Sequence, residues 1–296
     1  MFHTAAAVTI DTLVEAHFRL DGGAMFGIIP KPLWQRGNPA DELNRIDMSA
    51  RCLVIRHPTA GIILVDTGMG DKWDAKSREI YRLRPGSAEA PASSTGMDAG
   101  LRSLGLTTAD VNHVILTHLH FDHAGGLTRR HPVDGDPLAN VPAFPRACHH
   151  VLRENWSWAN RPSERDAGSY RDENFRFLAA GGAAPELVLH DGLTELFPGV
   201  SLIPRCGHTP GMACVLVRSE ADTYLFLADL IPTLGHLRIP YVMGYDLNPV
   251  KTCQEKRELL SEAARSGWRL VFAHDPVVES IRVEPDGRGE WRRACP

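Results

Sequence analysis

The sequence predicts a layered α/β protein with two packed, mixed β-sheets and helices outside them. Short apolar runs alternate with helical patterns, and four of the runs end in residues capable of chemistry. These runs are GIILVDTG (61–68), HVILTHLH (113–120), TYLFLADL (223–230) and RLVFAHDP (269–276). Residues 8–20 alternate between apolar and polar side chains, which favours a half-buried strand of a mixed sheet over a purely parallel one.

Helices and loops are indicated by their end signals. Residues 248–267 predict a helix, because a proline stands near the start and a glycine at the end. A second helical pattern, MDAGLRSLG, follows the stretch 85–96, which is rich in Gly, Pro and Ser. Residues 67–96 and 155–175 are long and polar, so we expect loops there, near a site or on the surface.

Composition limits the classes of function. With 296 residues, 43% of them hydrophobic, the chain can form one domain spanning 1–296. Its 32 basic and 36 acidic residues form no long block of one sign, so we expect no nucleic-acid partner. No run approaches the ~18 apolar residues of a membrane span, and the N-terminus lacks a secretory signal, which predicts a cytoplasmic protein that binds no membrane. Six scattered cysteines suggest reduced thiols.

The strongest signal is THLHFDHAGG, directly after the apolar run HVIL. It contains His118, His120, Asp122 and His123. Residues two apart in an extended segment point the same way, so His118 and His120 can share one ion. Where the chain turns, Asp122 and His123 can face a second ion. Imidazole and carboxylate ligands suit zinc and related first-row ions.

Three further ligand candidates lie beside apolar runs downstream. They are His208 in RCGHTPGM, Asp229 in FLADLIP and His274 in VFAHDP. A layered fold gathers distant strand ends, so these residues can complete the site. We interpret most other histidines as surface or hydrogen-bonded core residues, leaving aside His113 and His236.

Together, THLHFDHAGG, GHTPG, Asp229 and His274 resemble the metallo-β-lactamase superfamily, over most of the chain. The resemblance implies an αββα sandwich that holds two divalent metal ions, with zinc as the default. It implies one ion on His118, His120 and His208, a second on Asp122, His123 and His274, and Asp229 as the bridge. It also assigns Asp66 in VDTG to steadying the histidine loop, with a plain turn role as the alternative.

A closer resemblance lies in DGGAMFGIIPKPLW (21–34) and HLRIPYVMGYDLNP (236–249), which are similar to the YtnP-like branch of quorum-quenching N-acyl-homoserine lactone lactonases. That branch also resembles methyl parathion hydrolase and related arylesterases. The function implied is hydrolysis of a small lactone or ester by a hydroxide that two cations share, with Asp122 carrying the proton. No G-x-S-x-G motif supports a serine nucleophile.

The sequence departs from well-known lactonases at Pro232. They have a tyrosine three residues after the bridging aspartate, where it contacts the substrate carbonyl. His236, Tyr241 and Tyr245 are the candidates for this catalytic role, against the alternative that they cap a loop or pack. An apolar segment is the candidate acyl-chain contact, or else a core or dimer contact, and consists of Met25, Phe26, Ile28, Ile29 and Trp34.

Rival functions remain open. A thioester hydrolase of the glyoxalase II type would need a C-terminal helical domain, and only ~22 residues follow His274. Nuclease members carry an additional domain and a basic surface, and a β-lactamase has support only from the shared metal motif. A protein that binds metal without catalysis is the rival from another class. A homodimer is compatible with the sequence.

Overall fold

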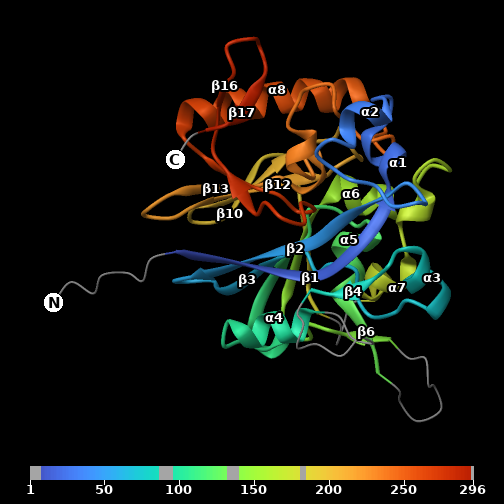
Figure 1. Cartoon of the computed structure of the whole chain (residues 1–296). Coiled ribbons are helices and arrows are strands. Elements are labelled where there is room, and N and C mark those ends of the chain that lie inside the picture. Colours follow the sequence, from blue (N-terminus) through green and yellow to red (C-terminus); the bar gives the residue numbers. More distant parts are fainter. Residues whose placement is uncertain (1–7, 87–95, 132–139, 181–184, 295–296) are drawn as a thin grey trace. The chain divides into compact units, whose positions relative to one another are not determined.

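The computed structural model describes residues 8–86, 96–131, 140–180 and 185–294 (Figure 1). Two compact units divide the chain: unit 1 comprises Met1–His17 and Ala50–Asp191, and unit 2 comprises Phe18–Ser49 and Gly192–Pro296. Strands β1 (Thr9–Asp21) and β2 (Arg45–His57) contribute residues to both units, so neither unit is a continuous stretch of chain. A single domain spanning 1–296 stays a prediction.

Unit 1 is built on a seven-stranded mixed sheet in the order β4-β1-β2-β3-β5-β8-β9. Strands β3, β5, β8 and β9 are mutually parallel, whereas β2 pairs with β3 and β1 with β4 in antiparallel fashion. The further strands are β3 (Gly61–Val65), β4 (Arg84–Pro85), β5 (Val111–Ile115), β8 (Cys148–Leu152), β9 (Leu187–His190) and the separate pair β6 (Thr128–Arg130) and β7 (Asn140–Pro142). The helices are α3 (Ala75–Ile80), α4 (Met97–Ser103), α5 (Phe121–Ala124), α6 (Arg153–Ala159) and α7 (Asp172–Phe175), with short 3₁₀ turns at Thr108–Asp110, Gly125–Leu127, Ala167–Ser169 and Arg176–Ala179.

The core of unit 1 covers one face of this sheet. Leu64 of β3 and Val114 of β5 are completely buried there, together with Leu101 of α4 and Phe175 of α7. Burying an aliphatic or aromatic side chain of this size contributes roughly 1.5–3 kcal/mol. The core therefore fixes β5, whose C-terminal end leads into the histidine motif.

Unit 2 contains a six-stranded sheet in the order β10-β11-β12-β13-β14-β15. All neighbours are antiparallel except β13 and β14. Its strands are β10 (Thr194–Phe197), β11 (Val200–Pro204), β12 (Ala213–Arg218), β13 (Thr223–Phe226), β14 (Arg269–Val271), β15 (Ser280–Ile281) and the separate pair β16 (Val283–Pro285) and β17 (Trp291–Arg293). The helices are α1 (Gly22–Phe26), α2 (Lys31–Trp34) and α8 (Pro249–Ser266), with 3₁₀ turns at Ala228–Leu230 and Leu234–His236.

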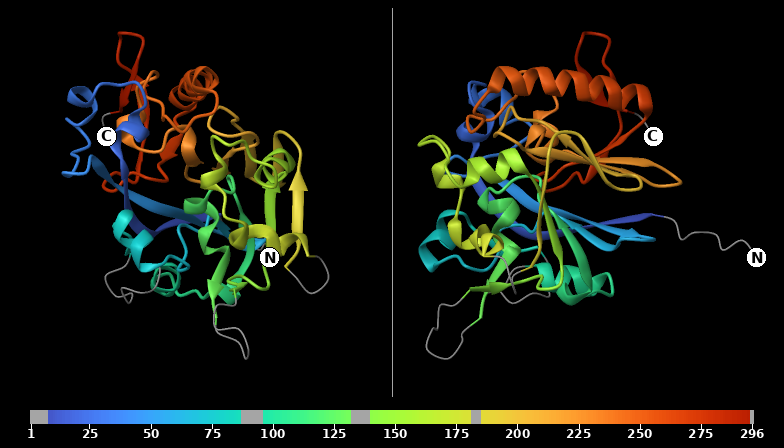
Figure 2. Two further views of the ribbon diagram at one scale, coloured as in Figure 1. Left: turned by 90° about the vertical axis from the view of Figure 1, so that its right-hand side faces the viewer. Right: turned by 180° about the vertical axis from the view of Figure 1, so that it is seen from behind.

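Helix α8 confirms the prediction for 248–267 and lies along one face of the unit 2 sheet (Figure 2). Asn248 caps its start by accepting a hydrogen bond from the Lys251 N–H, and Pro249 occupies the first turn. Gly267 ends it with a φ of 68°, a left-handed conformation that glycine adopts without steric cost. The four apolar runs with chemistry at their ends are also confirmed as strands, namely β3, β5, β13 and β14.

The expected loops contain short helices, so that part of the prediction was wrong. Helix α3 lies within 67–96, where the Asp74 carboxylate caps it by accepting from the Ser77 N–H at 2.7 Å. Helices α6 and α7 occupy parts of 155–175. Each has at most seven residues, too few for a hydrophobic period to show in the sequence. Residues 87–95 lie outside the described part of the chain.

The structure bears on two expectations drawn from composition, which concern membrane-spanning segments and the state of the cysteines. Within the described residues, no helix is both long and apolar enough to span a membrane. Among the same residues, the cysteines are free thiols, as expected; they are Cys52, Cys148, Cys206, Cys214 and Cys253. Cys295 lies outside the described residues.

Candidate metal centre

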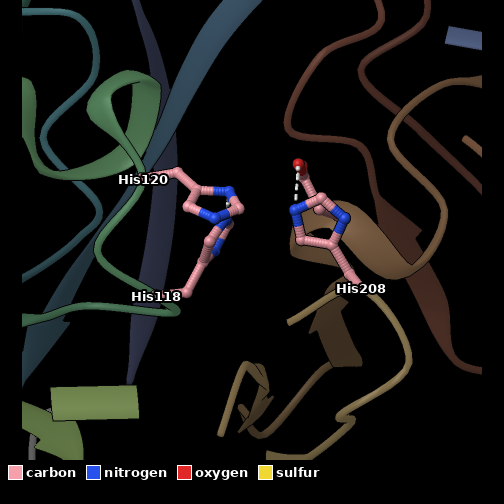
Figure 3. Close-up of side chains that lie close together, drawn as sticks. His118, His120 and His208 are labelled. Atoms are coloured by element: carbon pink, nitrogen blue, oxygen red, sulfur yellow. Dashed lines mark hydrogen bonds and ion pairs between the residues drawn. The ribbon is translucent and has the colours of Figure 1, made fainter. Parts of the chain in front are cut away.

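Unit 1 contributes the histidine motif, which occupies the turn between β5 and α5. His118 and His120 are buried, and the His118 Nε2 lies 3.1 Å from the His120 Nδ1 (Figure 3). Two nitrogens bound tetrahedrally to one zinc ion at 2.0–2.1 Å are separated by about 3.3 Å. The structure therefore brings these two side chains together at the spacing that one ion requires.

Asp66 holds this turn in place. It follows β3, is buried, and accepts hydrogen bonds from the Thr117 N–H and Thr117 hydroxyl, both at 2.8 Å. Its Oδ2 also lies 2.8 Å from the His123 Nδ1, which assigns the proton to that nitrogen and leaves Nε2 available to a metal. Asp66 has a φ of 59°, uncommon for a residue other than glycine, and four hydrogen bonds hold it there.

The remaining members of the turn are also fixed. The Thr117 hydroxyl lies 3.1 Å from the His118 Nδ1, so that ring also presents Nε2. Asp122 Oδ1 lies 3.9 Å from the His123 Nε2, and its side chain is 11% exposed, more than that of His123. Asn155 of α6 accepts a hydrogen bond from the Leu119 N–H at 2.9 Å. The sequence did not point to Asn155, because nothing in its spacing connects it to the motif.

The glycine pair that ends THLHFDHAGG has a steric reason. A Cβ at Gly125 would overlap the Met69 carbonyl oxygen, and one at Gly126 would overlap the Thr67 carbonyl oxygen. Only glycine allows α5 to lie this close to the loop that follows β3. The buried Lys72 ammonium donates to the carbonyls of Gly125 and Thr128, which ties the same two segments together.

Unit 2 contributes three ligand candidates from three strand ends. His208 follows β11, Asp229 follows β13 and His274 follows β14, and all three are buried. The Asp229 carboxylate lies between the two rings: Oδ2 is 3.3 Å from the His208 Nε2 and Oδ1 is 2.9 Å from the His274 Nε2. One carboxylate oxygen per imidazole is the arrangement expected of a carboxylate that bridges two ions.

Each of these histidines has a fixed acceptor on its other nitrogen. The His208 Nδ1 lies 2.9 Å from Asp246 Oδ1, and the His274 Nδ1 lies 2.8 Å from the Ser49 carbonyl oxygen. Such contacts orient a ligating ring and set its tautomer. Ala228, directly before Asp229, has a φ of 46°, a strained conformation of the kind that clusters at functional sites.

Helix α8 anchors the His208 loop. The buried Glu255 accepts hydrogen bonds from the backbone N–H groups of Cys206 and Gly207, at 2.8 and 3.0 Å. Burial raises the pKa of Glu255, and these hydrogen bonds partly offset that shift. The sequence signalled neither Glu255 nor Asp246, because each lies far along the chain from the loop that it holds.

The residues predicted to contact substrate lie in different environments. Phe26 is completely buried and stacks between Trp34 and His236, with ring centroids 5.3 and 4.3 Å apart. Met25 is buried too, whereas Ile29 is half-buried and Ile28 is 92% exposed. Phe26, Met25 and Trp34 are therefore buried in unit 2, which favours the core alternative, and their contact with an acyl chain stays a prediction.

His236 is completely buried as well. Its Nε2 lies 2.8 Å from the Met25 carbonyl oxygen and its Nδ1 lies 2.7 Å from the Thr233 hydroxyl. Burial lowers its pKa to about 3, so the ring is neutral. A ring with both nitrogens engaged favours the alternative that His236 packs, and its catalytic role stays a prediction. Tyr241 is half-buried, with its edge toward Phe26 at 6.2 Å, and Tyr245 is 38% exposed.

Pro232 and Lys256 stabilise the backbone near His274 and His236 through hydrogen bonds. The Pro232 carbonyl accepts a hydrogen bond from the His274 N–H at 2.9 Å, so this position supports a ligand candidate through its backbone. The buried Lys256 ammonium donates to the carbonyls of His236, Arg238 and Tyr241 at 2.6–2.8 Å. Burial lowers the pKa of Lys256 to about 7.

An aromatic cluster of unit 1 includes Phe121, the neighbour of Asp122 in the chain, and sequence patterns did not predict it. Trp73, Tyr81 and Phe121 pack edge to face or tilted, with ring centroids 5.2–5.7 Å apart. The Arg171 guanidinium lies 4.5 Å from the centre of the Trp73 ring, a cation–π contact. Burial and the charge of Asp122 raise the pKa of Tyr81, so its hydroxyl stays protonated.

Comparison with known proteins places this fold and these motifs in one family. Residues 46–274 match the metallo-beta-lactamase superfamily, and the chain belongs to that superfamily. Its fold, predicted from the sequence, is thereby confirmed. A solved structure of a probable metal-dependent hydrolase from Staphylococcus aureus superimposes with a TM-score of 0.83 at 26% identity, covering 99% of both chains.

The relatives are described either as metallo-hydrolases or as N-acyl homoserine lactonases. The probable metallo-hydrolase Rv2300c of Mycobacterium tuberculosis is 30% identical over 87% of this chain and 86% of its own length. The N-acyl homoserine lactonase AttM of Azorhizobium caulinodans is 30% identical over 61% of this chain and 64% of its own length. AidC, described as a dizinc quorum-quenching lactonase, shares the fold with a TM-score of 0.75 at 19% identity, covering 97% of this chain and 95% of AidC.

Proposed function

We propose that this protein is a dinuclear metal-dependent hydrolase that opens the ring of N-acyl-homoserine lactones. Membership of the superfamily and the names of the relatives, metallo-hydrolase and N-acyl homoserine lactonase, support it. The observation that carries the proposal is the Asp229 carboxylate, which presents one oxygen to the His208 Nε2 and the other to the His274 Nε2.

The proposed ligand set is the one that the resemblance implied. One ion would be held by His118, His120 and His208, the second by Asp122, His123 and His274, and Asp229 would be shared between them. The donors fit, because imidazole and carboxylate suit zinc and related ions. In each unit the histidine Nδ1 atoms of His118, His123, His208 and His274 have their own acceptors, which leaves Nε2 for coordination.

The ions, when bound, supply an acidified water as nucleophile and positive charge that stabilises the leaving alkoxide. The side chains of the protein then hold the ligand rings in position and orient them. Asp66 and Asp246 fix the imidazole rings, which limits the reorganisation needed during the reaction. Asp122, the most exposed carboxylate of the unit 1 half, accepts the proton of the nucleophile and returns it to the leaving oxygen.

Tyr81 takes the place of the tyrosine that is absent at Pro232. Its protonated hydroxyl, near enough to Asp122 to be affected by that charge, can donate a hydrogen bond to a substrate carbonyl. Trp73 and Phe121, packed against the Tyr81 ring, add flat apolar surface. That surface also favours a second candidate function, hydrolysis of aryl esters or organophosphate triesters, whose leaving groups are aromatic.

A substrate panel tests the proposal. Protein of measured metal content is assayed with acyl-homoserine lactones of several chain lengths, simple lactones, aryl esters and phosphotriesters. We expect the acyl-homoserine lactones to give the highest kcat/KM, and chelation to abolish turnover until divalent metal is restored. The variant Tyr81→Phe should lower kcat on lactones, while Tyr224→Phe, a matched half-buried tyrosine on β13, should not.

Each part of the proposal can be contradicted by a particular result of this panel. A higher kcat/KM for aryl esters or phosphotriesters than for every lactone would replace the lactonase assignment with the second candidate. Full activity of metal-free protein would overturn metal-dependent hydrolysis altogether. Metal binding without turnover of any substrate would favour the rival that binds metal without catalysis. Zinc as the resident metal, a homodimer and a cytoplasmic location stay predictions.

A further inference from the structure

Four chemistry-bearing side chains lie on one face of the unit 1 sheet, away from the histidine motif. Cys148 and His150 are two apart on β8 and therefore share a face. His113 of β5 is the cross-strand partner of Cys148, and His190 of β9 is the partner of Leu152, so both belong to the same face. Three neighbouring strands thus bring together a thiol and three imidazoles.

The spacing of three of these groups matches a metal site. The His113 Nδ1 lies 3.0 Å from the His150 Nε2, and one ligand atom each of His113, Cys148 and His150 lies within 4.8 Å of the others. For a tetrahedral zinc ion, bond lengths of about 2.05 Å to nitrogen and 2.3 Å to sulfur separate donors by roughly 3.3–3.6 Å. The two imidazole nitrogens are therefore near the donor separation of one ion, and the thiol lies within 4.8 Å of them.

The surroundings favour the metal-binding form of the histidines. Burial lowers the pKa of His150 to about 3, and burial also lowers the pKa values of His113 and His190. All three rings are therefore neutral near pH 7, as coordination requires. The His150 Nδ1 lies 3.0 Å from the His190 Nε2, which can accept its proton and leave the His150 Nε2 for the ion.

Cys148 distinguishes a metal site from a plain histidine relay. Hydrogen bonds from ring to ring account for His113, His150 and His190 without any ion, but they do not involve the thiol, which interacts with the Glu186 carboxylate. Burial, with the nearby Glu186 carboxylate, raises the pKa of Cys148 to about 11. Binding of a thiophilic cation would release that proton, because the thiolate is the ligand.

We propose that His113, Cys148 and His150 form a separate site for one zinc-like, thiophilic divalent cation, with His190 orienting the His150 ring. The half-buried positions of His113 and Cys148 leave the fourth coordination position to water. This site is independent of the proposed hydrolytic function, since the ligand set proposed for that function contains no cysteine.

Cobalt titration gives a direct readout. Purified protein, with its resident metal measured, is titrated with Co²⁺, and absorption by a thiolate-to-cobalt charge-transfer band is recorded. We expect the band to saturate at one Co²⁺ per chain. It should be lost in Cys148→Ser and His113→Gln and retained in Cys253→Ser, a matched control whose half-buried thiol lies on α8. Cobalt in the hydrolytic centre produces no such band.

A second measurement uses the wild-type protein, so it tests the site even if the variants fail to fold. In the wild-type protein, zinc should slow alkylation of Cys148 at least about tenfold, measured by peptide mass spectrometry, while alkylation of Cys253 stays unchanged. Absence of the band in the wild type, or a band that survives Cys148→Ser, would overturn the proposal. Equal alkylation of Cys148 with and without zinc would do the same and would leave a histidine relay as the function of the cluster.

Discussion

The two units hold their ligand candidates in different ways. In unit 1 the ligand candidates lie within six residues, from the turn after β5 into α5, and one carboxylate, Asp66, holds both His123 and Thr117. In unit 2 the candidates come from three separate strand ends, and each imidazole has its own acceptor, Asp246 for His208 and the Ser49 carbonyl for His274. In unit 1 one carboxylate therefore orients several members of the motif, with further support from Asn155, whereas in unit 2 each imidazole has its own acceptor.

This difference has consequences for stability and for mutation. A turn held by one carboxylate loses all its ligands together when that carboxylate is changed. Ligands from separate strands lose their positions one at a time, because each is fixed by the sheet and by a local acceptor. Asp229 is the exception in unit 2, since its carboxylate contacts both His208 and His274.

The largest effect is expected for Asp229→Ala. Removing the proposed bridge takes a ligand from both ions, so metal content should fall toward zero and kcat/KM should fall by more than the 10–100-fold typical of a residue behind the ligands. Elemental analysis and lactone kinetics measure both quantities. Glu220→Ala, an exposed acid in the same unit, is the matched control and should change neither. Loss of only one ion in Asp229→Ala would contradict the bridging role.

Phe26→Ala should come next and should act on stability. Phe26 is completely buried and stacks on His236 and Trp34, so its removal leaves a cavity that costs about 3–5 kcal/mol of unfolding free energy. Denaturant unfolding measures this loss. Since the ring belongs to the core of unit 2, kcat/KM should change equally for short and long acyl chains. A loss confined to long chains, at unchanged stability, would restore the pocket lip predicted from the sequence.

Asp66→Asn and Asp246→Asn test the comparison of single and separate supports. Asp66 orients His123 and the Thr117 that contacts His118, so Asp66→Asn should weaken both ions, roughly 10–100-fold in affinity. Asp246→Asn should weaken only the ion that His208 binds, because Asp246 contacts only that ligand candidate. Competitive titrations with a chelator measure the affinities of the two ions separately. Equal weakening of both ions in both variants would remove the proposed distinction.

The sequence predicted local features well and distant contacts poorly. The spacing of His118 and His120 predicted their shared orientation, because two residues in one extended segment leave little freedom. The contacts of Asp246 with His208 and of Glu255 with Gly207 join residues 38 and 48 positions apart, and no sequence spacing encodes them. The same limit applies to Cys148, whose partners stand on other strands and become neighbours only through sheet register.

The buried Phe26 shows a different limit. An apolar segment between glycines and prolines is equally compatible with a pocket wall and with a core contact, because both require the same side chains. Its environment is decided by Trp34 and His236, which stack on either side of it. The same limit applies to His236: sequence shows that a histidine can do chemistry, whereas its packing alternative depends on burial and on hydrogen bonds with distant residues.

The smallest effect concerns a histidine that lacks the supports described above. His149 of β8 is fully buried, packs on Phe177, and neither ring nitrogen lies in ordinary hydrogen-bonding geometry with a partner. Burial lowers its pKa to about 4, and the backbone carbonyls of Ala147 and Glu186 offset this only in part. The unfolded chain, with a histidine pKa near 6.5, therefore binds this proton more readily than the folded protein.

The stability that this neutral ring allows is fully present above about pH 6.5 and is lost as the pH falls toward about 4. Between about pH 7.5 and 5.5, the wild-type free energy of unfolding should fall by roughly 1 kcal/mol more than that of His149→Leu, which has no group to titrate there. Urea unfolding at each pH measures the difference, and His131→Leu at an exposed position is the matched control. If wild type and His149→Leu lose stability in parallel, His149 is protonated as easily in the folded protein as in the unfolded chain, and burial without a fixed acceptor does not distinguish it from the oriented histidines of the two half-sites.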